Sequence, residues 1–197
     1  MKRLLLACLL SGAFAQSAQA ALHEGDAAPD FNAQASRAGK VFTFGLQDAL
    51  KKGPVVVYFY PSAFTGGCNA QAHAFSENSD KFYVAGASVI GVSLDSIDRL
   101  NDFSTDPKYC AGKVAVASDV DGKIAKAYEL TVHEAVAGKK DTRGIEINHG
   151  FAERTTFIVS PDGKIIASLS GLAPEANVAK ALEVVQKLAD ANVNEKW

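Results

Sequence analysis

The sequence predicts an α/β protein in which a central mixed sheet is flanked by helices. Two continuous apolar runs, 54–60 and 88–94, are rich in β-branched and aromatic residues, as is typical of strands buried on both faces. Helical patterns separate these runs, and the chain closes with a hairpin pattern and an amphipathic helix. Strands that alternate with helices in this way form a sheet covered on both sides, so the order of elements predicts an α/β sandwich.

The first half of the chain supplies the first of these elements. Residues 40–50 predict a short strand followed by a helical turn, and 54–60 predicts the first buried strand. The stretch 67–83 predicts a helix, because its apolar residues recur at helical spacing on one face. These residues are Cys68, Ala72, Phe75 and Phe82.

The second half continues the alternation. Its predicted elements are a strand at 88–94, a helix at 96–104, a strand at 113–119, a short helix at 122–130, a hairpin at 154–171 and a helix at 174–191. Ser96 is a candidate N-cap for its helix, and Pro174 suits the first turn of the last one. The complete order of elements is that of the thioredoxin-like fold.

The stretch 131–152 is the least regular part of the chain, and we interpret it as a long loop or an extra hairpin. Long loops in compact domains are often functional. The charges of its central sequence KKDTRG, residues 139–144, predict a solvated loop tip.

Composition excludes several classes of function. The chain has 197 residues, of which 48% are hydrophobic and 21% charged, with a formal net charge of −2. No basic block is present, so we expect no nucleic-acid binding. The four histidines show no metal-ligand spacing with one another or with cysteine, so we expect no metal and no cofactor.

The N-terminus resembles a secretory signal peptide. Lys2 and Arg3 precede a short apolar run, and the small residues Ala18 and Ala20 form a cleavage site. A single membrane anchor is the alternative, but the apolar run is too short to span a bilayer. We therefore predict a signal peptide at 1–20, one domain at 21–197, and a periplasmic or secreted protein without a stable membrane anchor.

Cysteine usage draws attention to one position. Cys8 falls within the predicted signal peptide, so Cys68 and Cys110 remain. In an oxidising compartment such a pair is, or becomes, a disulfide. Cys68 follows a strand and a short loop at the start of a helix, where backbone N–H groups favour negative charge.

A helix start alone does not make a thiol reactive. It supplies about 0.3–1 kcal/mol, and at best about 2, whereas a predominantly ionised thiol at neutral pH needs about 2.7 kcal/mol. A nearby cation is therefore required. Arg154 is our candidate, because its strand neighbours 54–60 in a thioredoxin-like sheet. The alternative is an inert, buried Cys68 with Thr65 as a simple N-cap.

Three segments resemble the peroxiredoxins, thiol peroxidases with a thioredoxin-like fold. The pattern Pro61-x-x-x-Thr65-x-x-Cys68 resembles their active-site signature. GDAAPDFNAQ (25–34) resembles the N-terminal segment of the family, and ERTTFIVSPDGKII (153–166) resembles the segment with its active-site arginine. The likeness runs from about 25 to 171 and is nearest the bacterioferritin-comigratory-type branch of the alkyl hydroperoxide reductase/thiol-specific antioxidant group.

The resemblance implies a role for each of these residues. Cys68 would be the thiolate that attacks the peroxide and becomes a sulfenic acid. Thr65 would hydrogen-bond the thiolate and the peroxide, and Arg154 would stabilise the thiolate and the leaving oxygen. Pro61 would wall the pocket, or merely end a strand. Gln71 stands where the branch often has Glu; it would orient the arginine without a charge, or else face solvent.

The resemblance also suggests a partner thiol. Cys110 would be the resolving cysteine that condenses with the sulfenic acid, with a free loop thiol or a static disulfide as alternatives. The expected partners are a peroxide substrate and a thioredoxin-like protein reductant, and the protein itself would be a monomer or weak dimer. Gly66 departs from the family, which often has Pro there, and it loosens the loop.

Two other functions remain open at this point. A thioredoxin-type thiol–disulfide oxidoreductase would need a Cys-x-x-Cys motif, and Thr65 occupies the position of its first cysteine. A non-catalytic thioredoxin-like binding module would carry a static disulfide, and peroxide would leave its cysteines unchanged.

Overall fold

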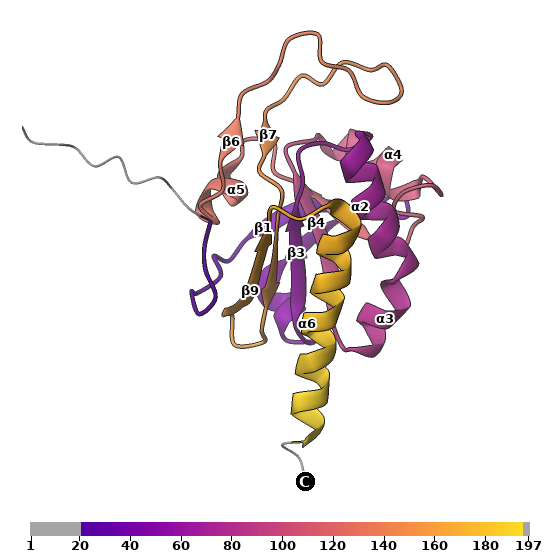
Figure 1. Cartoon of the computed structure of the whole chain (residues 1–197). Helices are drawn as coiled ribbons and strands as arrows, with labels where there is room; N and C mark the ends of the chain where they lie inside the picture. The colour runs from indigo at the N-terminus through magenta and orange to yellow at the C-terminus, as the bar shows by residue number, and fades with distance from the viewer. Residues whose placement is uncertain (1–20, 195–197) are drawn as a thin grey trace, which may run out of the picture.

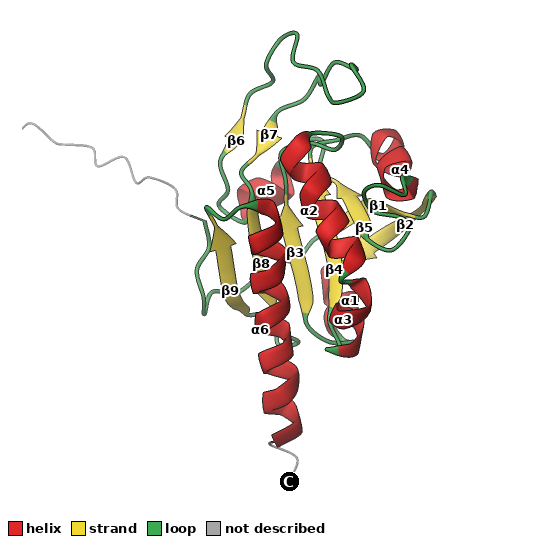
Figure 2. Ribbon diagram, turned by 45° about the vertical axis from the view of Figure 1, so that its right-hand side comes forward, coloured by secondary structure: helices red, strands yellow, loops and turns green. Residues whose placement is uncertain are grey.

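The computed structural model describes residues 21–194, which form a seven-stranded mixed sheet flanked by helices (Figures 1 and 2). The strands are β1 (Asn32–Arg37), β2 (Lys40–Gly45), β3 (Val55–Phe59), β4 (Ser88–Ser93), β5 (Ala115–Ser118), β6 (Val132–His133), β7 (Phe151–Ala152), β8 (Thr155–Val159) and β9 (Ile165–Ser170). The helices are α1 (Leu46–Leu50), α2 (Gly66–Glu77), α3 (Ser79–Val84), α4 (Ile97–Thr105), α5 (Lys123–Ala127) and α6 (Pro174–Asn194).

The large sheet has the strand order β2-β1-β5-β4-β3-β8-β9, with β3 near its centre. β3 pairs in parallel with β4 and antiparallel with β8, and β4 pairs in parallel with β5. The predicted α/β class, with a mixed sheet between helices, is confirmed.

Each face of the sheet carries its own hydrophobic core. Successive side chains of a strand point to opposite faces. In β3, Val56 and Tyr58 belong to the core beneath α2, α3, α4 and α6, whereas Val57 and Phe59 belong to the core beneath α1 and α5. Burial on both faces is the reason that β3 is a continuous apolar run rather than an alternating one.

Most predicted elements are present, and two differences are informative. The helix expected at 67–83 is two helices, because Asn78 leaves the helical conformation and its side-chain Nδ2 donates to the carbonyl of Ala74 (2.9 Å). β1 lacks the apolar pattern of a strand, since its buried positions hold small residues. These are Ala33, Ala35 and Ser36.

The irregular stretch 131–152 begins and ends in the predicted extra hairpin, formed by the short antiparallel pair β6 and β7. The loop between them projects from the end of the molecule where α2 begins (Figure 1). Of the helices within 21–194, none combines the length and the apolar character that crossing a membrane requires. The predicted signal peptide lies outside the described residues.

Candidate active site

Cys68 lies in the first turn of α2, directly above the end of β3. Its side chain is buried, with 2% of the residue exposed. Arg154 immediately precedes β8, and the register pairs Phe59 of β3 with Thr155 of β8. This pairing brings residue 154 to the start of α2, and Arg154 Nη2 donates to Cys68 Sγ at 3.2 Å. The cation that the sequence predicted for this thiol therefore lies in contact with it.

Gly67 allows this close approach of the arginine. A Cβ at residue 67 would lie 3.3 Å from Arg154 Nη2 and 3.4 Å from Cγ of Pro174. The first distance is tighter than most contacts of a Cβ atom, so any larger residue here requires the guanidinium to shift by a few tenths of an ångström. Gly66, by contrast, is exposed with open space around it, and nothing in its surroundings requires glycine.

Gln71 is fully buried, one helical turn after Cys68, and its Oε1 accepts a hydrogen bond from Arg154 Nη1. Its Nε2 donates to Asn177 Oδ1 of α6 (3.1 Å), which also accepts from Thr156 Oγ1 (2.6 Å). Asn177 in turn donates to the carbonyl of Leu169 (3.1 Å). A chain of neutral groups thus holds the arginine, and the solvent-facing alternative for Gln71 is wrong.

The charge of Arg154 has no acidic partner within the described residues: no carboxylate there lies at ion-pairing distance from it. An uncompensated cation in a partly buried site interacts strongly with a negative charge beside it. The arrangement therefore stabilises negative charge that develops next to the guanidinium.

Thr65 and Pro61 occupy the loop between β3 and α2, and both are half-buried. The Thr65 hydroxyl donates to the carbonyl of Ser62 (2.8 Å) and not to Cys68, and it makes no side-chain cap for α2. Thr65 is the N-cap residue of α2, as the alternative interpretation placed it, but the capping hydrogen bond that this interpretation assigns to its hydroxyl is not formed. The hydrogen bond to the thiolate that the resemblance implies is not formed in this structure. Pro61 lies two residues after the end of β3 and directly follows the apolar run 54–60.

Cys110 lies in the turn after α4 and is fully buried. Both Cys68 and Cys110 are free thiols, so the structure contains no static disulfide between them. Burial, together with the negative charge of Asp106, raises the pKa of Cys110 far above its usual range. In this folded arrangement Cys110 is a protonated thiol.

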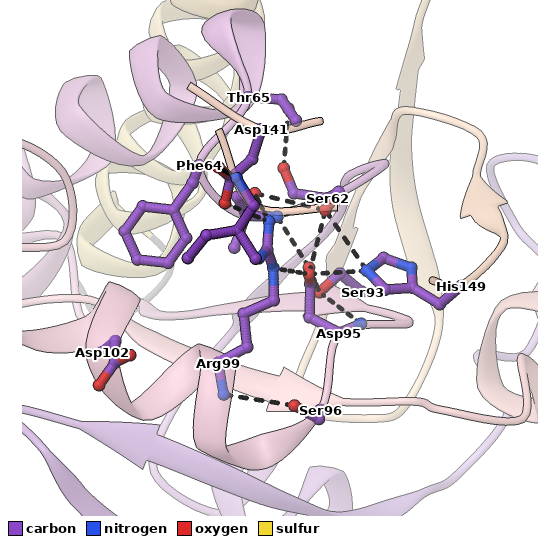
Figure 3. Close-up of polar contacts among 12 residues, drawn as sticks. Ser62, Phe64, Thr65, Ser93, Asp95, Ser96, Arg99, Asp102, Asp141 and His149 are labelled. Atoms are coloured by element: carbon purple, nitrogen blue, oxygen red, sulfur yellow. Dashed lines mark hydrogen bonds and ion pairs between the residues drawn. The ribbon is translucent and has the colours of Figure 1, made fainter. Parts of the chain in front are cut away.

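A second polar cluster, which the sequence analysis missed, lies on the other side of the same loop (Figure 3). Its centre is the fully buried carboxylate of Asp95, two residues after β4. That carboxylate accepts from the backbone N–H of Ala63 (2.7 Å), the hydroxyl of Ser62 (3.0 Å), Arg99 Nε (2.7 Å) and His149 Nε2 (2.8 Å). Asp95 therefore holds the backbone of the loop that leads to Cys68.

The surroundings of His149 favour its doubly protonated form. Its Nε2 faces the Asp95 carboxylate and its Nδ1 faces the carbonyl of Gly150 (2.7 Å), and both of these groups only accept hydrogen bonds. Burial disfavours the imidazolium, but the hydrogen bond and the charge of Asp95 outweigh it, so the pKa of His149 is raised. Burial likewise opposes the charge on Asp95, yet His149 and the hydrogen bonds from Ala63 and Ser93 keep its pKa lowered.

The solvated tip predicted for 139–144 is wrong for one of its charges, Asp141, whereas the other charged residues of the tip are exposed. The side chain of Asp141 is fully buried and pairs with Arg99 Nη2 (2.9 Å) and Arg143 Nη2 (3.0 Å). It also accepts backbone N–H groups of Arg143 (2.8 Å) and Ile145 (3.0 Å). The charge pattern of this stretch predicted exposure to solvent, but in the structure the loop returns to α4 and buries the Asp141 carboxylate.

One of the missed residues carried a usable signal. Asp95 follows a buried parallel strand, and polar residues at the carboxyl ends of such strands gather at one edge of the sheet. Asn177 carried none, because a polar residue in the first turns of an amphipathic helix is normally exposed.

Comparisons with known proteins identify the family and the fold of the chain. The model of the AhpC/TSA family matches residues 24–168. Peroxiredoxin Bcp of Escherichia coli K12 is 28% identical over 144 residues, covering 73% of this chain and 83% of that protein. The crystal structure of peroxidoxin BcpB from Mycobacterium tuberculosis has a TM-score of 0.70 at 26% identity, and the match covers 84% of this chain and 97% of that one.

A further solved structure, peroxiredoxin Q of Xanthomonas campestris, has a TM-score of 0.66 at 24% identity and covers 86% of this chain and 98% of that one. At this identity the likeness establishes the fold alone. The fold is the thioredoxin-like fold of these peroxiredoxin structures.

Proposed function

Because the chain belongs to the AhpC/TSA family of peroxiredoxins, it is a thiol-dependent peroxidase, and we propose that Cys68 is its reactive thiol. The proposed substrates are hydrogen peroxide and small organic hydroperoxides. The observation that carries the assignment is the contact between the Arg154 guanidinium and the Cys68 sulfur, with no carboxylate of the described chain competing for that cation.

In the first step the Cys68 thiolate attacks one oxygen of the peroxide. A sulfur–oxygen bond forms, the oxygen–oxygen bond breaks, and the second oxygen leaves as hydroxide or alkoxide, which takes up a proton. Cys68 becomes a sulfenic acid and the peroxide becomes water or an alcohol. Arg154 stabilises negative charge first on the sulfur and then on the leaving oxygen. Gln71 keeps the guanidinium oriented without neutralising it.

In the second step Cys110 attacks the sulfur of the sulfenic acid. The sulfur–sulfur bond forms, the hydroxyl leaves, and with the Cys110 proton it becomes water. Both cysteines are packed in the core as free thiols, so their sulfurs must move together to reach the bond length of about 2 Å. One segment therefore opens locally first, and opening also relieves the burial that keeps Cys110 protonated. A thioredoxin-like dithiol then reduces the disulfide.

Intact-mass measurement tests this sequence of steps. The reduced protein treated with one equivalent of hydrogen peroxide should lose two hydrogens within minutes. Cys110→Ser should instead gain one oxygen at Cys68, and Cys68→Ser should not react. An unchanged mass for the reduced protein would contradict the peroxidase chemistry at Cys68. An oxygen adduct in the protein with both cysteines would contradict only the role of Cys110.

We also propose that the protein is exported and cleaved after Ala20. The support is the basic, apolar and small-residue pattern of 1–20 together with a cysteine pair suited to an oxidising compartment. N-terminal sequencing of protein from a periplasmic or culture fraction should begin at Ala21. Retention of Met1 in a membrane fraction would favour the anchor instead.

A further inference from the structure

Phe64 is the most constrained residue of the loop that precedes Cys68. Its backbone is left-handed, with φ of 59°, which side chains of this size rarely adopt. Its carbonyl accepts two hydrogen bonds from Thr142, one from the backbone N–H and one from Oγ1, each 2.9 Å long. The Arg143 guanidinium lies over its ring, with Cζ 3.3 Å from the ring centroid. The loop within 131–152 thus clamps Phe64 at both backbone and side chain.

The same ring reaches the segment that carries Cys110. Phe64 packs edge-on against Phe103 of α4 (5.0 Å between centroids) and against Tyr109 (5.8 Å), and those two rings stack on each other (5.4 Å). Tyr109 directly precedes Cys110 in the chain. One aromatic trio, Phe64, Phe103 and Tyr109, therefore joins the loop before Cys68 to the turn that buries Cys110.

Arg143 is itself held in place. Its Nε and Nη2 donate to Asp141 Oδ2 at 3.1 and 3.0 Å, and Asp141 is anchored to Arg99 on α4. Figure 3 shows Phe64 beside the cluster of Asp95, Arg99 and Asp141. The guanidinium over the ring is thus a fixed contact that links the long loop to the body of the protein.

We propose that Arg143 is a positioning residue which, through Phe64, holds the Cys68 loop and the Cys110 turn closed and so sets the rate of disulfide formation. This inference rests on the proposed function, in which Cys110 resolves the sulfenic acid. Opening of the Cys110 turn separates Tyr109 from Phe64, and the Arg143 guanidinium holds the Phe64 ring in the position where Tyr109 packs against it.

The clamp also decides between two fates of the sulfenic acid. Attack by Cys110 gives the disulfide and releases water. A second hydrogen peroxide instead adds its oxygen to the Cys68 sulfur, giving a sulfinic acid and water. The first reaction needs the turn to open and the second does not. A stronger clamp therefore favours the sulfinic acid when peroxide is abundant.

The test compares Arg143→Met with two other variants on the same loop. Lys139→Met is the matched control, because Lys139 lies over the ring of Phe151 (4.3 Å) and not over Phe64. Arg143→Lys retains a cation and should restore much of the clamp. The first readout is the rate at which iodoacetamide alkylates Cys110 in the reduced protein, which requires opening but no peroxidase activity.

We expect iodoacetamide to alkylate Cys110 about fivefold faster in Arg143→Met than in the wild type. This factor corresponds to the loss of one partly buried cation–π contact. Disulfide formation after one equivalent of peroxide should accelerate by a similar factor, and the sulfinic fraction at excess peroxide should fall. Lys139→Met should match the wild type. In a Phe64→Leu background, adding Arg143→Met should have no further effect.

Equal alkylation rates in Arg143→Met and Lys139→Met would overturn the clamp, even if the disulfide still forms. Failure of the proposed function looks different: peroxide would then give no disulfide in the wild type, whatever the alkylation rates. If Arg143→Met does not fold, Thr142→Val tests the same clamp by removing one hydrogen bond to the Phe64 carbonyl. It should open Cys110 in the same direction, and an unchanged rate would count against the clamp.

Discussion

The loop before Cys68 is held from two sides by clusters of opposite design. On the sulfur side, Arg154 is a cation surrounded by neutral partners, Gln71 and Asn177. On the backbone side, Asp95 and the buried groups around it form closed ion pairs in which each charge has a counter-charge. The first arrangement leaves its charge available to a reacting group, and the second uses its charges on the protein itself.

This difference assigns two tasks to two groups of residues around one short loop: one group affects the reaction at Cys68, and the other holds the loop in place. A charge that is paired with an opposite charge interacts weakly with a substrate, because the electrostatic fields of the two charges largely cancel. An unpaired cation instead stabilises an anion beside it. We therefore expect replacement of Arg154 itself to change the rate of Cys68 oxidation with little effect on stability. Variants on the backbone side should change mainly the free energy of unfolding.

The largest expected effect is on the backbone side. Asp95→Asn places an amide N–H₂ against Arg99 and the His149 imidazolium and leaves His149 without a counter-charge. Breaking a buried ion pair from one side costs about 3–5 kcal/mol, so urea denaturation should show a loss of that order in the free energy of unfolding. Asp102→Asn is the control, because Asp102 is mostly exposed and should change stability by less than about 0.5 kcal/mol.

Arg154→Met should have the largest effect on the reaction. Loss of the guanidinium from the Cys68 sulfur should slow oxidation by hydrogen peroxide about 10²- to 10³-fold, as for removal of one preorganised donor from a developing anion. Stopped-flow mixing followed by intact mass measures this rate. Arg154→Lys should recover only part of the oxidation rate, because lysine keeps the positive charge but has no second nitrogen that could donate to Gln71. If Arg154→Met lost as much unfolding free energy as Asp95→Asn, the proposed difference between the two clusters would be contradicted.

Asn177→Leu tests whether the neutral hydrogen-bond chain behind Arg154 affects the reaction at Cys68. It leaves the Gln71 amide and the Thr156 hydroxyl without an acceptor in the core, which should cost about 1–3 kcal/mol of unfolding free energy. Gln71 then holds Arg154 less firmly, so peroxide oxidation should slow, but by less than in Arg154→Met. Thr156→Val removes a donor farther from the arginine and should lower stability by about 1 kcal/mol while leaving the oxidation rate unchanged.

The smallest effect concerns pH. The pKa of His149 is raised in the folded protein, so its contribution to stability is complete below pH 6.5, its ordinary value, and is lost as pH rises through the folded-state pKa. His149→Gln should therefore be less stable than the wild type at pH 5.5, and the difference should shrink at alkaline pH. Urea midpoints measured for both proteins between pH 5.5 and 9 test this, and a constant difference would mean that His149 does not titrate against Asp95.

The sequence by itself determined the α/β class and the strand–loop–helix segment that carries Cys68. The β3 run is apolar throughout because both faces are covered, and this signal is local to a few residues. Pro61, Thr65, Cys68 and Gln71 share one strand–loop–helix segment, so their proximity follows from chain connectivity. Arg154 was within reach of prediction because the strand after it pairs with β3, and the pairing fixes which residues meet. The roles assigned to these residues and to Cys110 remain predictions.

Only the tertiary structure decided which charges are buried. Asp141 lies in a polar stretch that predicts solvent, yet it is buried because the long loop returns to α4 and brings this carboxylate to Arg99. Arg143 of the same stretch lies over the ring of Phe64. Asn177 reaches Gln71 from a helix 106 residues farther along the chain. Hydrophobic patterns repeat within a few residues and can be seen in a sequence. The partner of a buried polar group is chosen by how distant segments pack, and no local pattern encodes it.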